Sequence, residues 1–425
     1  MPPTGGPTRR FKYGTDSNRS RRMLGAGTLL ALAFVAAGIA LGTASGLLPG
    51  LHANNMAFLL AGVAPSVPGP PLYVAMAMLS AGVVHTFLDV VPSLALGVPD
   101  ASMAAVALPG HRLVLEGRGR EALRLSALGS GGAVLLAVPL AVPLTRLMVA
   151  AWPAIRANLE PILLCIAALL VFTEGTPSSM LGAAVSLVAS GLLGVATLDL
   201  DPEAPLSAGG VLAPLFAGLF GAPVLVDAIG GSGIPAQGDS TVAVSKPELA
   251  GLTGIGTVAG AIVGYVPAVS SAIAATGALL AVPGRYGARG FVVATSGVNT
   301  SNAIFALVAL VALGFPRTGV LVAVDSVGAP LSLPHLLTAA ALAAAAGFLL
   351  VVTVGDRYLA AVGRVDATLL SVGILAGLAA LSYLFAGPSG VVAYLAAGVV
   401  GLVPARFRAR RAALMGVLFG PLLVG

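Results

Sequence analysis

The chain carries a faint internal duplication, and the two copies stand on opposite charge backgrounds. The tetrapeptide GLLP at 46–49 recurs 218 positions later as GYVP at 264–267. A second element, LGVP at 96–99, recurs 217 positions later as LGFP at 313–316. Two elements repeated at nearly the same offset indicate that each half forms the same succession of broken and unbroken segments.

Basic residues are distributed unequally between equivalent loops of the two copies. The turn at 64–70 has no Lys or Arg, whereas the matching turn of the second copy holds Arg285 and Arg289. After the second LGxP element only Arg317 precedes His335, whereas four arginines follow the first: Arg112, Arg118, Arg120 and Arg124. Because Lys and Arg concentrate in cytoplasmic loops, the imbalance predicts that one copy is inserted upside down relative to the other.

Composition excludes a soluble globule. The chain is 57% hydrophobic and 9% charged, with a mean hydropathy of +1.00, whereas soluble domains carry about 25% charged residues. At roughly 20 residues per span, 425 residues accommodate ten to twelve crossings. The net charge of +6 comes from short basic blocks between apolar runs, which orient a membrane protein and do not indicate nucleic-acid binding. Cys165 is the single cysteine, so no internal disulfide and no cysteine metal motif is expected.

We therefore expect an all-α integral membrane protein with about 10–12 transmembrane helices in two inverted repeats, which contain broken or re-entrant segments. It is expected to cross the cell membrane many times, with its N-terminus in the cytoplasm. A loop at 317–333 is expected outside, and two separate spans are expected near 367–386 and 389–404. The predicted organisation is a disordered basic cytoplasmic tail (1–22), a first membrane repeat (23–205), a re-entrant or interfacial connector (206–248) and a second membrane repeat (249–425).

Both copies are interrupted inside an apolar stretch, and polar residues follow each interruption. Proline removes a backbone donor, and broken backbone at membrane depth persists only where protein or a watery cavity satisfies it. A helix that starts there points its free N–H groups and positive dipole end into the cavity, which suits an anion such as a carboxylate. The predicted substrate-binding residues of the two breaks are Pro49, Gly50, His52, Asn54, Asn55, Pro267, Ser270 and Ser271.

The return span of each copy also carries polar residues, which are costly in a membrane and commonly functional there. His85 and Asp89 lie four residues apart and share one face of a helix. We predict them as ion-coupling residues, with Asp89 taking Na⁺ or a proton. In the second copy Asn299, Thr300 and Asn302 complete the predicted substrate site. Aligning the LGxP elements makes Asn302 of the second copy equivalent in position to His85 of the first.

Structural roles remain open for several of these residues. Asp89 can form a static pair with His85, and His52 can simply cap a helix end. Hydroxyl groups in membrane helices often bond to their own backbone or to a neighbouring helix, which applies to Ser270, Ser271, Thr295 and Ser296.

Several motifs resemble, in order, those of the large membrane subunit of tripartite tricarboxylate transporters, the TctA-like permeases. They are GLLPGL at 46–51, LPGHRL at 108–113, EGRG at 116–119, EAL at 121–123, GTP at 175–177 and PLFAGLF at 214–220. The resemblance covers roughly residues 40–300. It implies a multi-pass permease that works with a small membrane subunit and an extracytoplasmic binding protein to import citrate-like carboxylates on an ion gradient.

The sequence thus predicts a secondary-active permease that imports a small organic anion, with Na⁺ or H⁺ as coupling ion, no resident cofactor or metal, no enzymatic activity and no nucleic-acid partner. Two alternatives remain at this point. One is an intramembrane enzyme acting on a lipid through His52, His85 and Asp89. The other is a membrane assembly protein that transports nothing, which leaves the matched polar patches of the two copies unexplained.

Overall fold

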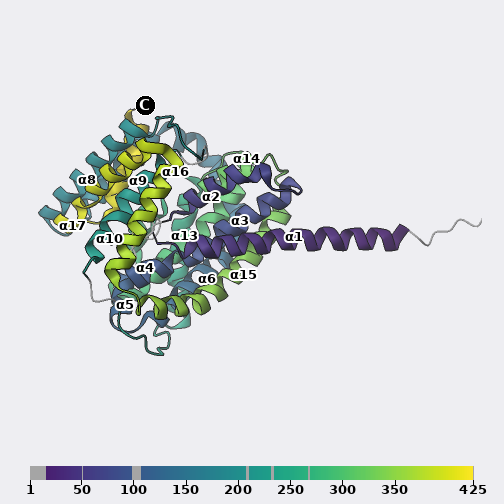
Figure 1. Cartoon of the computed structure of the whole chain (residues 1–425), viewed down its shortest axis with the longest axis horizontal. Coiled ribbons are helices and arrows are strands. Elements are labelled where there is room, and N and C mark those ends of the chain that lie inside the picture. Colours follow the sequence, from purple (N-terminus) through teal and green to yellow (C-terminus); the bar gives the residue numbers. More distant parts are fainter. Residues whose placement is uncertain are drawn as a thin grey trace, which may run out of the picture.

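The computed structural model describes residues 16–49, 51–97, 107–206, 210–230, 234–266 and 269–424. Within these ranges all regular elements are helices, which confirms the all-α prediction (Figure 1). Eight of these helices are long and apolar enough to cross a membrane. They are Gly25–Gly46, Pro71–Leu96, Gly119–Ala157, Pro177–Thr197, Lys246–Tyr265, Gly284–Leu313, Leu333–Val362 and Ala367–Phe407.

Both predicted interruptions are present, and the helices around them follow the same order. A long helix is followed by a break, an 11-residue helix, a 3₁₀ turn and a return helix. In the first copy these are α1 (Asp16–Gly46), α2 (Ala53–Val63), η1 (Ala64–Ser66), α3 (Pro71–Leu88) and α4 (Val90–Leu96). In the second copy they are α11 (Lys246–Tyr265), α12 (Ser271–Ala281), η4 (Gly284–Tyr286) and α13 (Gly287–Leu313).

The LGxP glycines close both return helices in the same way. Gly97 has φ 67° and Gly314 has φ 68°, the left-handed conformation that glycine adopts at a helix C-terminus without steric cost.

The remaining helices follow each return helix. After the first copy come α5 (Ala107–Leu115), α6 (Gly119–Ala157), α7 (Leu159–Phe172), α8 (Pro177–Thr197), α9 (Leu212–Phe216), η3 (Ala217–Gly221) and α10 (Ala222–Ala228). After the second come α14 (Gly319–Ser326), α15 (Leu333–Val362), α16 (Ala367–Gly401), α17 (Val403–Phe407), η5 (Arg411–Met415) and α18 (Gly416–Val424).

Glycine stripes bring each long helix against its return helix in one register. A Cβ at Gly38 or Gly42 would collide with the backbone of Ala77 or Ala81 on α3. On α11, Gly256 and Gly260 meet the backbone of Ala294 and Val298 on α13, the positions that lie 217 residues after Ala77 and Ala81. Small residues allow membrane helices to approach until their backbones touch. The duplication therefore extends from the motifs to the packing.

Beyond these helix pairs, the packing crosses between the copies. Helix α6 of the first copy packs on α13 of the second, and α15 of the second packs on α3 of the first. Likewise α9, η3 and α10 pack on α16, whereas η5 and α18 pack on α8. Neither copy is therefore a separate domain. This exchange is what a two-fold relation between the copies produces, and their opposite orientation in the membrane stays a prediction.

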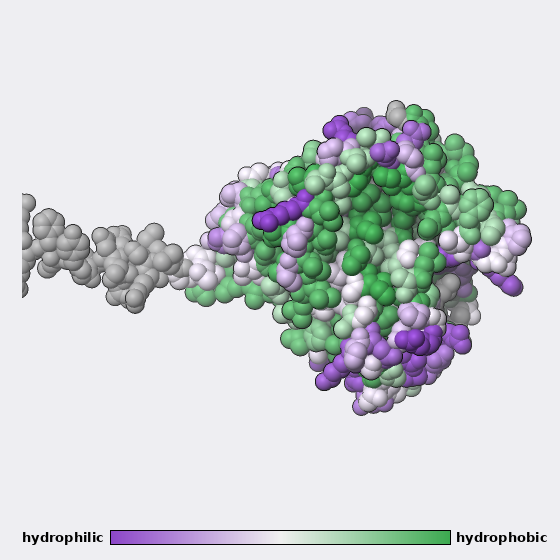
Figure 2. All heavy atoms as spheres, turned by 180° about the vertical axis from the view of Figure 1, so that it is seen from behind, coloured by the Kyte–Doolittle hydropathy of each residue, from purple (hydrophilic) through white to green (hydrophobic). Residues whose placement is uncertain are grey.

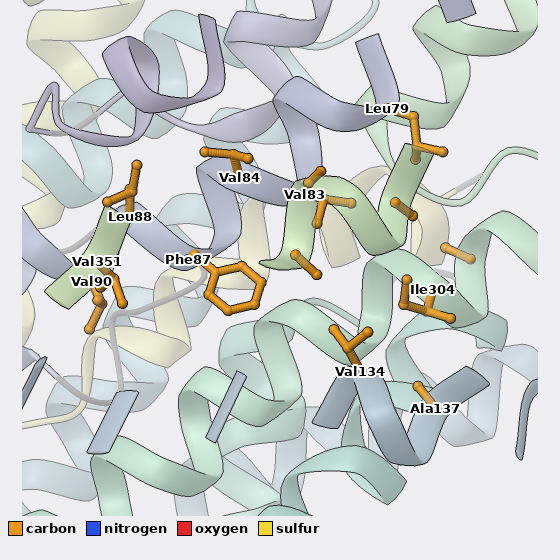
Figure 3. Packing of buried hydrophobic residues seen from close by; sticks show 14 of the residues in the cluster. Leu79, Val83, Val84, Phe87, Leu88, Val90, Val134, Ala137, Ile304 and Val351 are labelled. Carbon is orange, nitrogen blue, oxygen red and sulfur yellow. The ribbon is translucent and has the colours of Figure 1, made fainter. Parts of the chain in front are cut away.

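The return helix of the first copy forms the centre of the core. In the most apolar 18-residue window of α3 and α4, 94% of the residues are buried, against 17% for α1. Phe87 and its neighbours on α3 pack against Val134 of α6, Ile304 of α13 and Val351 of α15 (Figure 3). One face of the molecule carries a broad apolar region between hydrophilic patches (Figure 2). Large apolar side chains such as Leu135, Leu192 and Val399 are exposed on the protein surface. An apolar exterior of this kind suits a lipid solvent.

Three local expectations differ from the structure. Helix α1 begins at Asp16, inside the tail expected to be disordered to residue 22, because no Pro or Gly stands between Asp16 and the apolar run. The loop expected at 317–333 contains α14. The two spans expected near 367–386 and 389–404 are joined in α16, which is kinked where Ala386 and Gly387 leave helical geometry.

The number of long helices in the described ranges, eight, is lower than the ten to twelve spans expected from the sequence. The difference lies in that joined pair and in three apolar helices of 10–17 residues: Leu159–Phe172, Leu212–Ala228 and Arg411–Val424. A straight helix that crosses a bilayer needs about 17–25 residues.

The close approach of α11 and α13 can be tested at one glycine. We expect Gly256→Ala to lower the unfolding free energy by about 1–3 kcal/mol, because the new methyl group collides with the Ala294 carbonyl. Gly251→Ala on the same helix meets nothing within 4 Å and should be neutral or stabilising by up to about 1 kcal/mol. Thermal unfolding in detergent measures both, and equal shifts would contradict the packing.

The inverted orientation of the copies predicts labelling from opposite sides. In a Cys165→Ser background, Glu116→Cys and Ser326→Cys place single thiols at exposed positions between α5 and α6 and at the end of α14. We expect an impermeant thiol reagent to reach Glu116→Cys from the cytoplasm and Ser326→Cys from outside. Labelling of both from one side would refute the inversion.

Candidate functional site

A cavity of about 230 Å³ lies where the two interrupted segments meet. Its wall is formed by residues of α2, α3, α11, α12, α13 and α14, together with residues of α9, η5 and α18. Six residues predicted from the sequence line it: His52, Asn54, Ser270, Ser271, Asn299 and Asn302. Most of the remaining wall is aliphatic.

Three helices begin at this cavity. His52 caps α2, with Nδ1 accepting from Asn54 N at 3.0 Å. Ser270 caps α12, with Oγ accepting from Ile273 N at 3.3 Å. Thr318 caps α14. Each cap satisfies one of the four free N–H groups at a helix start, and the dipoles favour negative charge in the space between.

The starts of α2 and α14 are joined directly. The side-chain Oδ1 of Asn54 accepts from the backbone N–H of Gly319 at 2.9 Å. The imidazole of His52 stacks on Phe216, with 5.2 Å between ring centroids. The predicted capping role of His52 is therefore present, and its ring also forms part of the cavity wall.

Two amides of α13 face the cavity with different surroundings. Asn302 is 9% exposed, and its Oδ1 is buried with no hydrogen-bond partner in the described part of the chain. A buried amide oxygen of this kind is costly unless a ligand or water reaches it. Asn299 instead donates from Nδ2 to Asp89 Oδ2 at 2.6 Å.

Asp89 lies one side chain behind the cavity wall. It stands where α3 gives way to α4 and is 2% exposed. Through its contact with Asn299, it touches a residue that lines the cavity. The Nδ1 of His85 lies 2.9 Å from Ser45 Oγ on α1. Although the repeat aligns His85 with Asn302, only Asn302 lines the cavity.

The other predicted residues lie elsewhere. Thr300 is buried and donates to Ser130 Oγ at 2.8 Å, which ties α13 to α6. Asn55 is buried outside the cavity wall, and its Oδ1 has no partner in the described ranges. Pro49 lines a separate apolar pocket against α16. Gly50 and Pro267 lie outside the described residues.

The sequence interpretation missed Arg317 as a site residue. It precedes the cap of α14 and lines the cavity, although its position after the LGFP element made it look like a topology signal only. Burial lowers the pKa of its guanidinium from its ordinary value, and a basic group of this strength stays charged at neutral pH. Its distance from the other basic blocks of the sequence is the signal that distinguishes it.

The three residues named for the enzyme alternative, His52, His85 and Asp89, do not meet at the cavity wall. His52 lines the cavity, whereas His85 and Asp89 do not. In the part of the chain that the structure describes, no group of three or more His, Cys, Asp or Glu side chains is placed to hold a metal ion. The cavity is lined by helix starts, amides and one guanidinium.

Comparison with known proteins agrees with this architecture. The model of the tripartite tricarboxylate transporter TctA family matches residues 32–416. The chain belongs to that family and is a multi-pass membrane component of a tricarboxylate transporter. An uncharacterized protein of Methanocaldococcus jannaschii (MJ1079) is similar over 406 residues at 26% identity, which covers 93% of this chain and 99% of that protein. No solved structure matches.

The two amides of α13 should respond differently to truncation. We expect Asn302→Ala to leave the unfolding temperature of the ligand-free protein unchanged or raised, because it removes a buried oxygen that lacks a partner. Asn299→Ala should cost about 1–3 kcal/mol of stability, because the Asp89 carboxylate loses its amide donor. Thermal unfolding of both variants in detergent checks this, and an equal loss in both would contradict the assignment.

Proposed function

We propose that this protein is a secondary-active permease that imports a small organic anion of the carboxylate class, and that Na⁺ or H⁺ drives the import. The observation that carries the proposal is the convergence of the starts of α2, α12 and α14 on one largely apolar cavity. Helix starts supply N–H donors and a positive potential without a mobile countercharge. In a desolvated cavity, these favour an anion over a neutral solute of the same size.

The size of the cavity supports a small solute. Drug-sized ligands occupy pockets of about 300–1,000 Å³, and this cavity is about 230 Å³. The wall combines residues of both copies, with α2 from the first and α12 and α13 from the second. Transporters with inverted repeats place their substrate at such an interface, where one repeat can rock against the other.

Asp89 is the proposed coupling group. A carboxylate within a membrane costs about 2.5–3.5 kcal/mol on insertion scales, so binding a cation or a proton there changes the local energy strongly. Asn299 contacts Asp89 on one side and the cavity on the other. Occupation of Asp89 by an ion therefore alters the hydrogen bonding of a residue that meets the substrate, and this gives the two sites a direct link.

The TctA family is named for a tripartite transporter. We therefore propose that the permease works with a small membrane subunit and an extracytoplasmic binding protein. As a separate proposal, the N-terminus is cytoplasmic.

Transport can be tested with the full chain in proteoliposomes. Vesicles loaded with unlabelled citrate or succinate should take up the same labelled acid by exchange, and protein-free vesicles should not. Exchange needs no ion gradient, so it tests substrate binding and translocation separately from coupling. The absence of exchange for every carboxylate tried, by protein that unfolds cooperatively, would refute the proposal.

Coupling through Asp89 predicts a split between exchange and accumulation. We expect Asp89→Asn to retain exchange but to lose accumulation driven by an imposed Na⁺ or H⁺ gradient, because the variant can neither bind the cation nor carry the proton. Asp199→Asn is the control, since Asp199 is exposed between α8 and α9, far from the cavity wall in sequence. Accumulation by Asp89→Asn equal to that of the parent would contradict the coupling role.

A further inference from the structure

Arg317 differs from the other partly buried arginines in its partners. Within the described ranges those arginines have carboxylates nearby: Arg118 and Arg289 with Glu121, Arg120 with Asp356, Arg124 with Asp239, Arg410 with Glu174 and Arg411 with Asp227. Arg317 forms no such pair there. Its Nε and Nη2 are buried and make no hydrogen bond within the same ranges. A buried guanidinium without an anion is a costly arrangement.

Two aromatic rings hold the guanidinium in place. Its central carbon lies 4.6 Å from the ring centroid of Trp152 and 5.8 Å from that of Phe315. Cation–π contact stabilises the charge through the face of the group. Its N–H donors lie in the plane of the group and remain suited to the bidentate hydrogen bonds that a carboxylate accepts. The rings thus orient the arginine and leave its donors to a ligand.

The cavity beside Arg317 contains a second unpaired polar group. Asn302, only 9% exposed, also lines the wall and has no partner for Oδ1 in the described chain. An amide oxygen accepts hydrogen bonds and does not satisfy a carboxylate, but it suits a substrate hydroxyl or a protonated acid group. The unpaired guanidinium therefore calls for a ligand that carries negative charge, and the Asn302 oxygen additionally suits one with a hydroxyl group, as citrate has.

We propose that Arg317 is the residue that selects substrates with two or more carboxylates over those with one. This assignment rests on the proposed function. One carboxylate lies at the starts of α2 and α12, where the helix dipoles suffice. A second carboxylate pairs with the guanidinium of Arg317 next to the start of α14. A monocarboxylate meets the helix starts alone and leaves Arg317 unpaired.

The first copy has no arginine at the sequence position equivalent to Arg317. The position 217 residues before Arg317 is Asp100, which lies outside the described residues. The aligned positions of the two copies therefore bear opposite charges in the sequence.

The sole tryptophan of the chain, Trp152, reports on this arginine. We expect succinate and citrate to change its fluorescence in a saturable manner in the purified full-length protein, at constant ionic strength. Isothermal titration calorimetry of succinate and butyrate gives affinities that do not depend on the tryptophan. Arg317→Gln should weaken succinate binding by about 10- to 100-fold, since it removes charged hydrogen bonds, and should change butyrate binding less than about 3-fold. Arg317→Lys should retain part of the preference for succinate.

Arg285→Gln is the matched control. Arg285 also lies 4.6 Å from an aromatic centroid, that of Tyr286, but it stands at the opposite end of α13 and outside the cavity wall. The Arg285→Gln variant should bind succinate and butyrate with the same affinities as the parent protein.

Succinate binding by Arg317→Gln equal to that of the parent would overturn the inference and leave the anion permease intact. Equal loss of succinate and butyrate binding would also overturn it, because it indicates a structural role. So would calorimetric binding of succinate without a change at Trp152. A parent protein that binds none of the three acids would refute the proposed function itself, and the selectivity assignment with it.

Discussion

Helix starts inside an apolar body are the constraint on which the rest of this structure depends. The first N–H groups of α2 and α12 have no partner within their own helices, and lipid offers none. The caps His52 and Ser270 satisfy part of this demand, and the start of α14 meets α2 through Asn54. What remains is a largely apolar space that the starts of these helices face. The cavity is thus a consequence of breaking two helices at equivalent positions in a duplicated chain.

The glycine stripes make this arrangement possible. With Gly38 and Gly42 against α3, and Gly256 and Gly260 against α13, each long helix touches the backbone of its return helix. Side chains larger than hydrogen would separate these helices and displace the breaks from the polar residues of the return helices. Packing that appears purely structural therefore sets the distances between the helix starts and the amides of α13.

Asn299 connects the buried carboxylate of Asp89 with the cavity wall. Its amide donates to Asp89 and its side chain also lines the cavity, so a change of charge at Asp89 cannot leave the cavity unaffected. Charges interact more strongly in surroundings of low polarity than in water, and Asp89 is 2% exposed. Asn299 therefore links the proposed coupling group to the proposed substrate cavity, and Arg317 is the group to which we assign the charge preference of that cavity.

The helical fold and the two breaks can be predicted from the sequence because they depend on local patterns of residues. Proline, glycine and polar residues within apolar runs predicted both breaks, the helical fold and six residues of the cavity wall. The LGxP elements predicted equivalent positions, including His85 opposite Asn302, but equivalence of position does not fix surroundings. His85 meets Ser45 on α1, whereas Asn302 faces the cavity.

Only the tertiary structure decided which groups are left without partners. In the sequence Arg317 is one more arginine in a loop, and the pattern predicts no helix directly after it. Its role depends on the packing of α14 against α2 and on the nearness of Trp152, more than 160 residues away. Composition and spacing fix where a chain breaks and which parts avoid water. Partners brought together over long distances determine whether a buried charge is satisfied or waits for a ligand, and a linear pattern does not encode those distances.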